Sequence, residues 1–188
     1  MMMKAVFLLW TCLLLTGCAT LSREQCQRGD WFDIGSSDGL AGQPLSRLEQ
    51  HQRACGEYGI PVDQQQYFSG HAQGLQDYCQ LDNAFRSGLE GNRYQGVCPP
   101  AIDAAFERAN RTAYQVYRLR KELDQVEDQL RQNERRLRDY DLSDDNRRRI
   151  RSDLRDLDRE RGRLQNDLYE SEQDLDRLRH EADLYHRR

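Results

Sequence analysis

The sequence predicts an all-α protein, with a small disulfide-stapled helical domain followed by a long antiparallel helical hairpin that forms a coiled coil. Three observations support this prediction: apolar residues alternate three and four positions apart from Ile102 onward, four cysteines fall within residues 26–100, and the glycines of that region recur at helical spacing. Charged residues make up 32% of the chain, yet the net charge is only -4. This near balance favours long solvated helices over a nucleic-acid-binding protein.

The first residues form a leader. Ala5 to Leu15 is an apolar run of 11 residues that follows a short basic start and ends in Leu15-Thr16-Gly17-Cys18. The run is too short for a transmembrane helix, which needs about 20 residues, and is typical of a signal peptide. Small residues before a cysteine at this place resemble the lipobox of bacterial lipoproteins. The alternative is an ordinary signal peptide that happens to contain Cys18.

The lipobox resemblance implies that the peptide of residues 1–17 is removed and that Cys18 is lipidated. Stable attachment takes about two acyl chains, and a fully modified lipoprotein carries more than that. Ala19, and not Asp, follows the cysteine, and by resemblance to the enterobacterial sorting rule this favours the outer membrane, facing the periplasm. We expect residues 18–25 to form the lipidated tether, residues 26–100 the compact domain and residues 101–188 the hairpin.

Four cysteines remain for the compact domain once Cys12 and Cys18 are assigned to the leader and the lipid. They are Cys26, Cys55, Cys79 and Cys98. An even number in an exported chain predicts two disulfides, and a domain with so few aliphatic residues needs them for stability. Three pairings are possible. We favour Cys26–Cys55 with Cys79–Cys98, because this pairing closes two local loops.

Glycine spacing predicts close helix packing in the compact domain. Intervals of three or four residues place glycines on one helix face, where a missing side chain lets two backbones approach. The sets are Gly35, Gly39 and Gly42; Gly70 and Gly74; and Gly88 and Gly91. Asp63 with Gln66 predicts an N-cap for a helix over 64–80, and Pro44 can open the preceding helix. We expect four short helices; a glycine-rich set of turns and strands is the alternative.

A family resemblance rests on the spacing of these glycines, aromatics and cysteines. The motifs are Trp31-x3-Gly35-x3-Gly39-x2-Gly42, His51-x3-Cys55, Tyr67-x2-Gly70-x3-Gly74-Leu75-x2-Tyr78-Cys79 and Gly91-x2-Tyr94-x2-Val97-Cys98-Pro99. Over residues 18–120 the chain resembles a family of short proteobacterial lipoproteins catalogued as a domain of unknown function. The resemblance implies a location and a shared small domain, and it brings no activity.

Catalytic and metal-binding patterns are sparse. His51 and Cys55 at i, i+4 could place two metal ligands on one helix face, but an oxidising compartment favours disulfides. We therefore expect no metal and no cofactor. No hydrolase elbow, phosphate loop or haem-attachment motif occurs, so we expect no enzyme. The aromatic residues of the domain are expected in its core, and a shallow glycan-binding platform is the alternative.

Heptads organise the tail. One register places Val116, Leu123, Leu130 and Leu137 at a, with Leu119, Val126, Asn133 and Tyr140 at d. A second places Leu154, Arg161, Leu168, Leu175 and Ala182 at a, with Ile150, Leu157, Leu164, Ser171, Leu178 and Tyr185 at d. This pattern predicts a coiled coil.

An antiparallel hairpin pairs an a position of one helix with a d position of the other. The predicted register puts Leu137 opposite Ile150 and Leu130 opposite Leu157, with the turn at residues 141–146 and Ser143 capping the second helix. The alternative is an intermolecular dimer or trimer, so the coiled coil could make the protein oligomeric.

Basic residues concentrate at the expected tip of the hairpin, in Arg147, Arg148, Arg149 and Arg151. A solvated helix start beside Asp144 and Asp145 explains them most simply, and a contact with peptidoglycan or an envelope protein is the sharper hypothesis. We expect a structural or protein-interaction role in the cell envelope, with membrane lipid bound through the acyl chains on Cys18. The alternative is a small-molecule or glycan-binding module.

Overall fold

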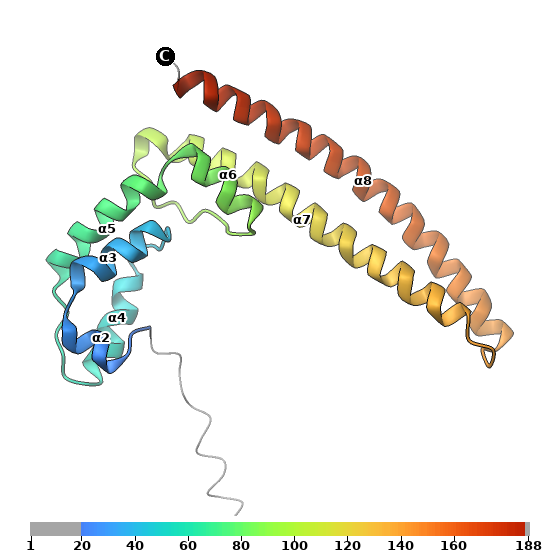
Figure 1. Ribbon diagram of the computed structural model, residues 1–188, viewed down its shortest axis with the longest axis horizontal. Coiled ribbons are helices and arrows are strands. Elements are labelled where there is room, and N and C mark those ends of the chain that lie inside the picture. The colour runs from blue at the N-terminus through green and yellow to red at the C-terminus, as the bar shows by residue number, and fades with distance from the viewer. Residues whose placement is uncertain (1–19, 187–188) are drawn as a thin grey trace, which may run out of the picture. The chain divides into compact units, whose positions relative to one another are not determined.

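The computed structural model describes residues 20–186, in which every regular element is a helix (Figure 1). The helices are α2 (Arg23–Arg28), α3 (Trp31–Leu40), α4 (Arg47–Gly56), α5 (Gln64–Tyr78), α6 (Leu81–Leu89), α7 (Pro100–Leu137) and α8 (Asp144–His186). The all-α prediction is confirmed, and the four short helices expected in the compact domain are α3 to α6. The leader and Cys18 lie outside the described residues.

The chain divides into two compact units between Tyr78 and Cys79, and not at Pro100 as expected. The sequence does change character at Pro100, because α7 begins there. However, the first turns of α7 pack against α6 inside the second unit. The change in composition therefore marks the start of a helix and not the edge of a unit.

The first unit is built on a crossing of α3 and α5 in which backbone touches backbone. A Cβ added at Gly70 would lie 1.9 Å from the carbonyl oxygen of Phe32, and one at Gly74 would lie 2.2 Å from that of Ser36. From the other side, a Cβ at Gly35 would lie 2.1 Å from the carbonyl oxygen of Tyr67. The close approach expected from the glycine spacing is confirmed at this crossing.

Around the crossing, a small core is closed by a disulfide. Cys26 and Cys55 are bonded, with their Cα atoms 5.5 Å apart, and this matches the favoured pairing. Trp31, Leu48 and Tyr67 pack in the same core. Since the core is small, the covalent link between α2 and α4 limits the entropy of the unfolded chain where apolar burial alone is modest.

The residues expected to form a tether are already part of this unit. Leu21 is only 5% exposed and packs in the core. Ser22 caps α2: its hydroxyl accepts from the Gln25 N–H at 3.2 Å, and the Gln25 side chain accepts from the Ser22 N–H at 2.8 Å. The expectation of a tether over residues 18–25 is therefore wrong from Thr20 onward, because this segment is packed and capped.

A similar helix pair opens the second unit, where α6 packs on α7. A Cβ at Gly88 would lie 2.5 Å from the carbonyl oxygen of Asn110 and 2.7 Å from the Cβ of Ala113. The disulfide Cys79–Cys98, with a Cα separation of 5.7 Å, joins the residues before the two helices. This bond also matches the favoured pairing.

Both α3 and α6 end with the same four-residue motif, Gly-Leu-x-Gly, at residues 39–42 and 88–91. The last glycine of each motif has positive φ, 65° at Gly42 and 88° at Gly91. Two backbone hydrogen bonds close each helix end, in the pattern of a Schellman cap. Gly42 and Gly91 were expected on helix faces; instead they follow the helix ends, where the left-handed conformation favours glycine.

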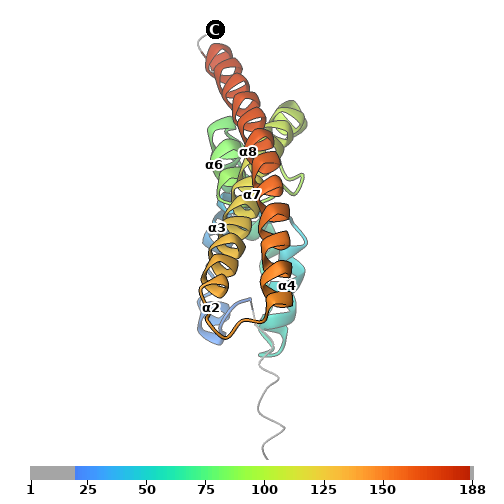
Figure 2. The ribbon, with the colours of Figure 1, turned by 90° about the vertical axis from the view of Figure 1, so that its right-hand side faces the viewer.

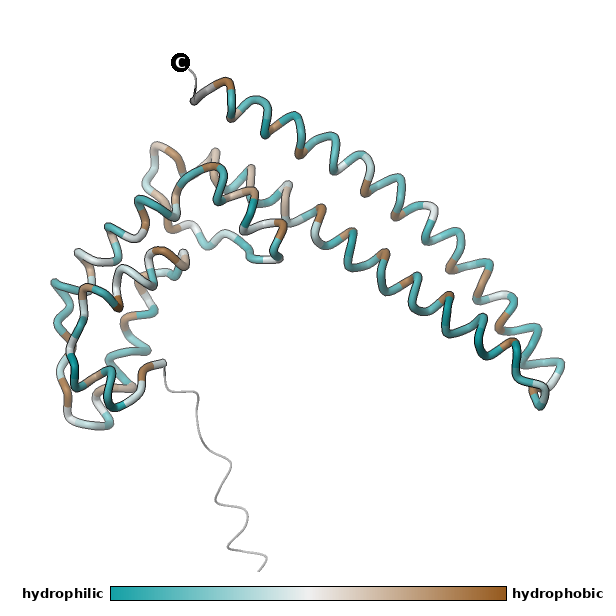
Figure 3. The backbone as a smooth tube through the Cα atoms, viewed as in Figure 1, coloured by the Kyte–Doolittle hydropathy of each residue, from teal (hydrophilic) through white to brown (hydrophobic). Residues whose placement is uncertain are grey.

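The two long helices of the second unit run side by side as an antiparallel hairpin (Figures 1 and 2). At 1.5 Å per residue, the 38 residues of α7 and the 43 of α8 span about 57 and 64 Å. In Figure 3 the apolar positions recur at intervals along both helices between hydrophilic stretches. They include the heptad positions Val116, Leu119, Val126, Leu130, Ile150, Leu175 and Ala182, which are buried.

Cross-helix contacts agree with the expected register. Ala105 and Ala182, which this register places opposite each other, line the same groove. Arg120 and Glu172 form an ion pair at 2.6 Å, and both occupy the e positions that flank the seam. Glu127 and Arg131 pair along the outer face at 3.7 Å, as expected for an i, i+4 pair.

The turn of the hairpin lies at residues 138–143, three residues earlier than expected. Tyr140, assigned to a d position, is 98% exposed because α7 has already ended at Leu137. Ser143 does cap α8, since its hydroxyl accepts from the Asn146 N–H at 3.4 Å. The acidic pair Asp144–Asp145 therefore lies in the first turn of the helix, where its negative charge interacts favourably with the positive end of the helix dipole.

Candidate functional site

The best-defined candidate site is a polar cleft in the first unit, about 390 Å³ in volume. It lies between the segment that begins at Thr20 and the helices α3 and α4. Its wall holds groups of both charges, together with one histidine. These residues are Arg28, Asp30, Asp33, Asp38, Arg47 and His51.

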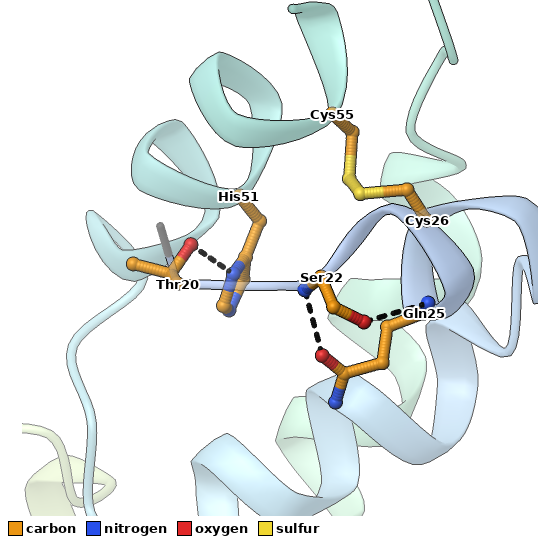
Figure 4. The surroundings of a disulfide bond; sticks show 6 residues. All are labelled: Thr20, Ser22, Gln25, Cys26, His51 and Cys55. Carbon is orange, nitrogen blue, oxygen red and sulfur yellow. Dashed lines mark hydrogen bonds between the residues drawn. A yellow bond between two sulfur atoms is a disulfide. The ribbon is translucent and has the colours of Figure 1, made fainter. Parts of the chain in front are cut away.

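A chain of hydrogen bonds forms the inner wall of the cleft. The Thr20 hydroxyl lies 2.8 Å from Nδ1 of His51, and Nε2 of His51 lies 2.8 Å from Oδ2 of Asp38. The Tyr67 hydroxyl donates to the same carboxylate oxygen at 2.8 Å. Figure 4 shows Thr20 and His51 meeting near the Cys26–Cys55 disulfide, with the capping pair Ser22 and Gln25 below the disulfide in this view. Three separate segments thus converge on the carboxylate of α3: α4 and α5 directly, and the segment of Thr20 through His51.

Burial and hydrogen bonding act in opposite directions on Asp38. Burial raises the pKa of its carboxyl, but the hydrogen bonds from His51 and Tyr67 and the nearby positive charge of Arg47 outweigh it, so the pKa lies below its ordinary value. Burial and the adjacent carboxylate raise the pKa of Tyr67 far above its usual range. Near neutral pH, Asp38 is therefore an anion and Tyr67 is a neutral donor.

Both ring nitrogens of His51 are used in this chain of hydrogen bonds. Its side chain is buried, with 2% of the residue exposed. An ionised carboxylate only accepts hydrogen bonds, so Nε2 carries the proton and donates to Asp38. The ring links the start of the described chain to α3 and positions the carboxylate.

Arg47 supplies a positive charge at the same wall. Its Nη1 donates to Gln50 at 2.6 Å, whereas its Nε is buried without a hydrogen-bond partner. A buried N–H without an acceptor costs free energy, which an acceptor from outside the chain would offset. The cleft thus combines a fixed carboxylate with a guanidinium that still has a donor to offer.

The α6–α7 pair of the second unit resembles the α3–α5 pair but lacks the pairing of Asp38 with Tyr67. When the two Gly-Leu-x-Gly motifs are aligned, Ser87 takes the place of Asp38. When the glycine contacts on the following helices are aligned, Phe106 takes the place of Tyr67. Both Ser87 and Phe106 are buried. The helix crossing therefore forms without a tyrosine–carboxylate pair, and the packing of the fold does not by itself require Asp38.

By contrast, the buried side chain of His71 in the first unit has a counterpart in the second unit, Asn110. Nε2 of His71 lies 2.7 Å from the carbonyl oxygen of Gln43, and Nδ2 of Asn110 donates to that of Asn92 at 3.0 Å. Gln43 and Asn92 each follow the positive-φ glycine of the cap. His71 thus has a structural role in holding the helix end.

The metal hypothesis for His51 and Cys55 is not supported by their surroundings. Cys55 is bonded to Cys26, and both nitrogens of His51 are engaged. Within residues 20–186 no cluster of three His, Cys, Asp or Glu side chains could hold a metal ion. The aromatic residues Trp31, Tyr67 and Tyr78 lie in the core, as expected, whereas Phe32 and Tyr58 are partly exposed.

A second candidate surface is the tip of the α7–α8 hairpin. Here Arg147 is committed to the turn, since Nη1 donates to the Leu137 carbonyl at 3.0 Å and Nη2 to that of Asp139 at 3.3 Å. Arg148 pairs with Asp145. Of the four arginines named as candidates for a partner contact, Arg147 therefore has a structural role, and Arg149 and Arg151 remain exposed on α8.

Sequence reasoning did not find Thr20, Asp38 and Tyr67 as one group. These residues are 18 and 29 positions apart along the chain, so no local motif contains them. One signal was available: the repeated Gly-Leu-x-Gly motif aligns Asp38 with Ser87 and reveals where the two halves differ in charge.

The comparisons with known proteins give one match to a family model, over part of the chain, and no activity. No curated protein and no solved structure matches the chain. In the part of the chain that the structure describes, no helix is long and apolar enough to cross a bilayer. Residues 30–115, from the start of α3 to the first four turns of α7, match the model of a family described as protein of unknown function (DUF2799).

Proposed function

We propose that the protein is a lipoprotein of the bacterial outer membrane that faces the periplasm, and that its α7–α8 hairpin is a structural arm that contacts another component of the envelope. The observation that carries this proposal is the hairpin itself. Most of its apolar residues pack in the seam or against α6, and ion pairs lie along its exposed faces. Such an arm can present its tip to a partner at a distance from the rest of the unit. We assign it no catalytic step.

The location is supported by two independent features. Two disulfides are typical of a protein that folds outside the reducing cytoplasm. The sequence Leu15-Thr16-Gly17-Cys18 after an apolar run fits lipidation at Cys18. Acyl chains on that cysteine would hold the chain at the membrane without a transmembrane helix.

The tip has the chemistry of a contact surface for an anionic partner. Between Arg135 and Arg151 there are seven basic and four acidic residues, although the chain as a whole has a net charge of -4. Tyr140 adds a fully exposed aromatic ring at the turn. Aromatic and arginine side chains are the residue types enriched in binding hot spots, so peptidoglycan or an acidic face of an envelope protein fits this surface.

Replacing the proposed lipidation site tests the location. The Cys18→Ser variant should lose incorporation of labelled palmitate and move from the membrane fraction to the soluble periplasmic fraction. Retention of the variant in the outer membrane would refute lipid anchoring. A Cys12→Ser variant is the matched control, because Cys12 lies inside the apolar run and should leave lipidation unchanged.

Photo-cross-linking in cells tests the arm. A photoreactive residue at position 140 should capture an envelope component, and the double variant Arg149→Glu/Arg151→Glu should reduce that capture. The matched control is Arg155→Glu/Arg163→Glu, which makes the same charge change farther along the exposed face of α8. Equal loss in both double variants would mean that overall charge, and not the tip, determines the contact.

A ligand-binding module is the second candidate function, favoured by the cleft between Thr20 and Arg47. This cleft contains the buried, unpartnered Nε of Arg47 and a carboxylate that the helix crossing does not require. The aromatic residues of the first unit give weaker support for glycan binding, because Trp31, Tyr67 and Tyr78 are buried in the core and only a few others, such as Phe32 and Tyr58, are partly exposed.

A further inference from the structure

We infer that the cleft beside Thr20 binds the headgroup of a membrane phospholipid that carries both a phosphate and a primary ammonium, as a phosphoethanolamine headgroup does. The inference rests on the proposed anchoring at Cys18 for its setting, and on the geometry of the cleft for its chemistry. It assigns the first unit a role at the bilayer surface, separate from the role of the hairpin.

The distance along the chain places the cleft at the depth of the headgroups. Only Ala19 separates Cys18 from Thr20, whose hydroxyl is bonded to His51 in the cleft wall. Two residues of extended chain span at most about 7 Å. The headgroup layer of each leaflet is itself about 5 to 8 Å thick. With acyl chains on Cys18, the cleft therefore opens among the headgroups and not at the end of a long linker.

The order of the segment from Thr20 to Arg28 strengthens this placement. Leu21 is buried in the core and Ser22 caps α2, so the described chain is fixed from its first residues. An anchor attached to such a segment limits how far the unit can move from the membrane. The same segment contributes Thr20 and Arg28 to the cleft, so the attachment point and the binding site share one element.

The charges in the cleft match the two ends of the headgroup. Arg47 has a buried Nε–H without an acceptor, and Arg28 lines the same cleft. Guanidinium groups bind phosphate oxygens well because their N–H donors lie in one plane. Asp30 pairs with Arg28 at 3.9 Å, and Asp33 and Asp38 supply carboxylates for an ammonium group. A purely anionic headgroup would leave these two carboxylates facing like charge.

Asp38 is held ready for the ammonium end. His51 and Tyr67 both donate to its Oδ2, which fixes the plane of the carboxylate and leaves Oδ1 as its second acceptor. The carboxylate is partly open, with 16% of its side chain exposed. In the second unit, where Ser87 and Phe106 take the corresponding places, this set is absent, which ties it to a task of the first unit alone.

The test uses the full mature chain from residue 18 with Cys18→Ser, so that binding does not depend on the lipid anchor. Vesicles of phosphatidylcholine containing phosphatidylethanolamine should float with this protein, and vesicles of phosphatidylcholine alone should not. Arg28→Gln and Asp33→Asn lie at exposed positions that leave the core intact, and each should weaken binding about fivefold, the effect of losing one partly exposed charged contact. Arg53→Gln and Asp77→Asn are matched controls on other parts of the same unit.

Three results would overturn the inference. Equal binding to vesicles containing phosphatidylglycerol would mean that general charge attraction is at work. Equal loss in the control variants would remove the role of the cleft. Binding of free phosphoethanolamine without binding to the vesicles would exclude the membrane as the source of the ligand. Because the protein carries no anchor, failure here is distinct from failure of Cys18→Ser to release the protein in cells.

Discussion

Gly70→Ala is expected to destabilise the first unit, because this glycine lies where α5 touches the backbone of α3. Its added Cβ would fall 1.9 Å from the Phe32 carbonyl oxygen, whereas real contacts of this kind stay above 3.0 Å, so the helices must separate locally by roughly 1 Å. Overpacking of this kind costs about 1 to 3 kcal/mol. The rigid backbone on the far side favours the upper end, and the better helix propensity of alanine returns about 1 kcal/mol. The net loss should be about 2 kcal/mol.

Urea unfolding followed by the fluorescence of Trp31 measures this effect. Trp31 begins α3 and is the only tryptophan after the leader, so its emission reports on the first unit alone. With a slope near 2 kcal/mol per molar urea, the midpoint should fall by about 1 M. Gly56→Ala is the matched control, since no atom lies within 4 Å of a Cβ added there. Equal midpoints for the two variants would refute the reasoning that the glycines permit a backbone contact.

Three further predictions concern the hairpin, the second disulfide and Asp38. Gly162→Ala should stabilise α8 by about 1 kcal/mol, because the site is helical and a Cβ there meets nothing within 4 Å; helical circular dichroism during thermal unfolding measures it. Replacing Cys79 and Cys98 together by serine should cost the second unit about 3 kcal/mol, since the bond closes a loop of 19 residues; the same unfolding experiment would contradict this if the loss were under about 1 kcal/mol. The pKa of Asp38 is lower in the folded state than its ordinary value of 3.8, so its stabilising effect is complete above that value and is lost as pH falls through the folded pKa. Tyr67→Phe removes one of the donors that lower this pKa, so Trp31 fluorescence should show a smaller loss of stability between pH 7 and pH 3 than in the unchanged protein.

The long helices were predictable because their signal is periodic and local. Every a and d position from Arg147 to Ala182 is buried or half-buried in α8, as the heptads require. The turn was placed three residues late because the heptads alone do not locate the end of α7. Tyr140 continues the spacing but follows Leu137, where the helix stops.

The division of the chain was harder to predict, because α7 uses two faces. Its first turns present Phe106, Ala109 and Ala113 to the α6 side, and later turns present Val126 and Leu130 to α8. The sequence shows both sets as apolar positions in one helix. Nothing in their spacing says that the first set belongs to a motif that began at Cys79.

The cleft could not be predicted from spacing, because its members come from distant segments. Asp38 is 13 residues from His51 and 29 from Tyr67; the α3–α5 crossing brings it beside Tyr67, and His51 reaches it from α4. The i, i+4 spacing of His51 and Cys55 is compatible with a metal site, but that cysteine is bonded to Cys26. Local spacing thus singled out His51 but did not reveal its partners, Thr20 and Asp38.

The two helix pairs together separate what the fold needs from what the first unit adds. Both pairs use a Gly-Leu-x-Gly cap, a close backbone contact at a glycine, a buried polar side chain that binds the residue after the cap, and one disulfide. At the place where they differ, the second unit has Ser87 and Phe106 and the first has Asp38 and Tyr67. A partly buried carboxylate needs donors to offset its desolvation, and His51 and Tyr67 provide them. Since the same crossing forms without that charge, its presence is better explained by what the cleft binds than by the stability of the helices around it.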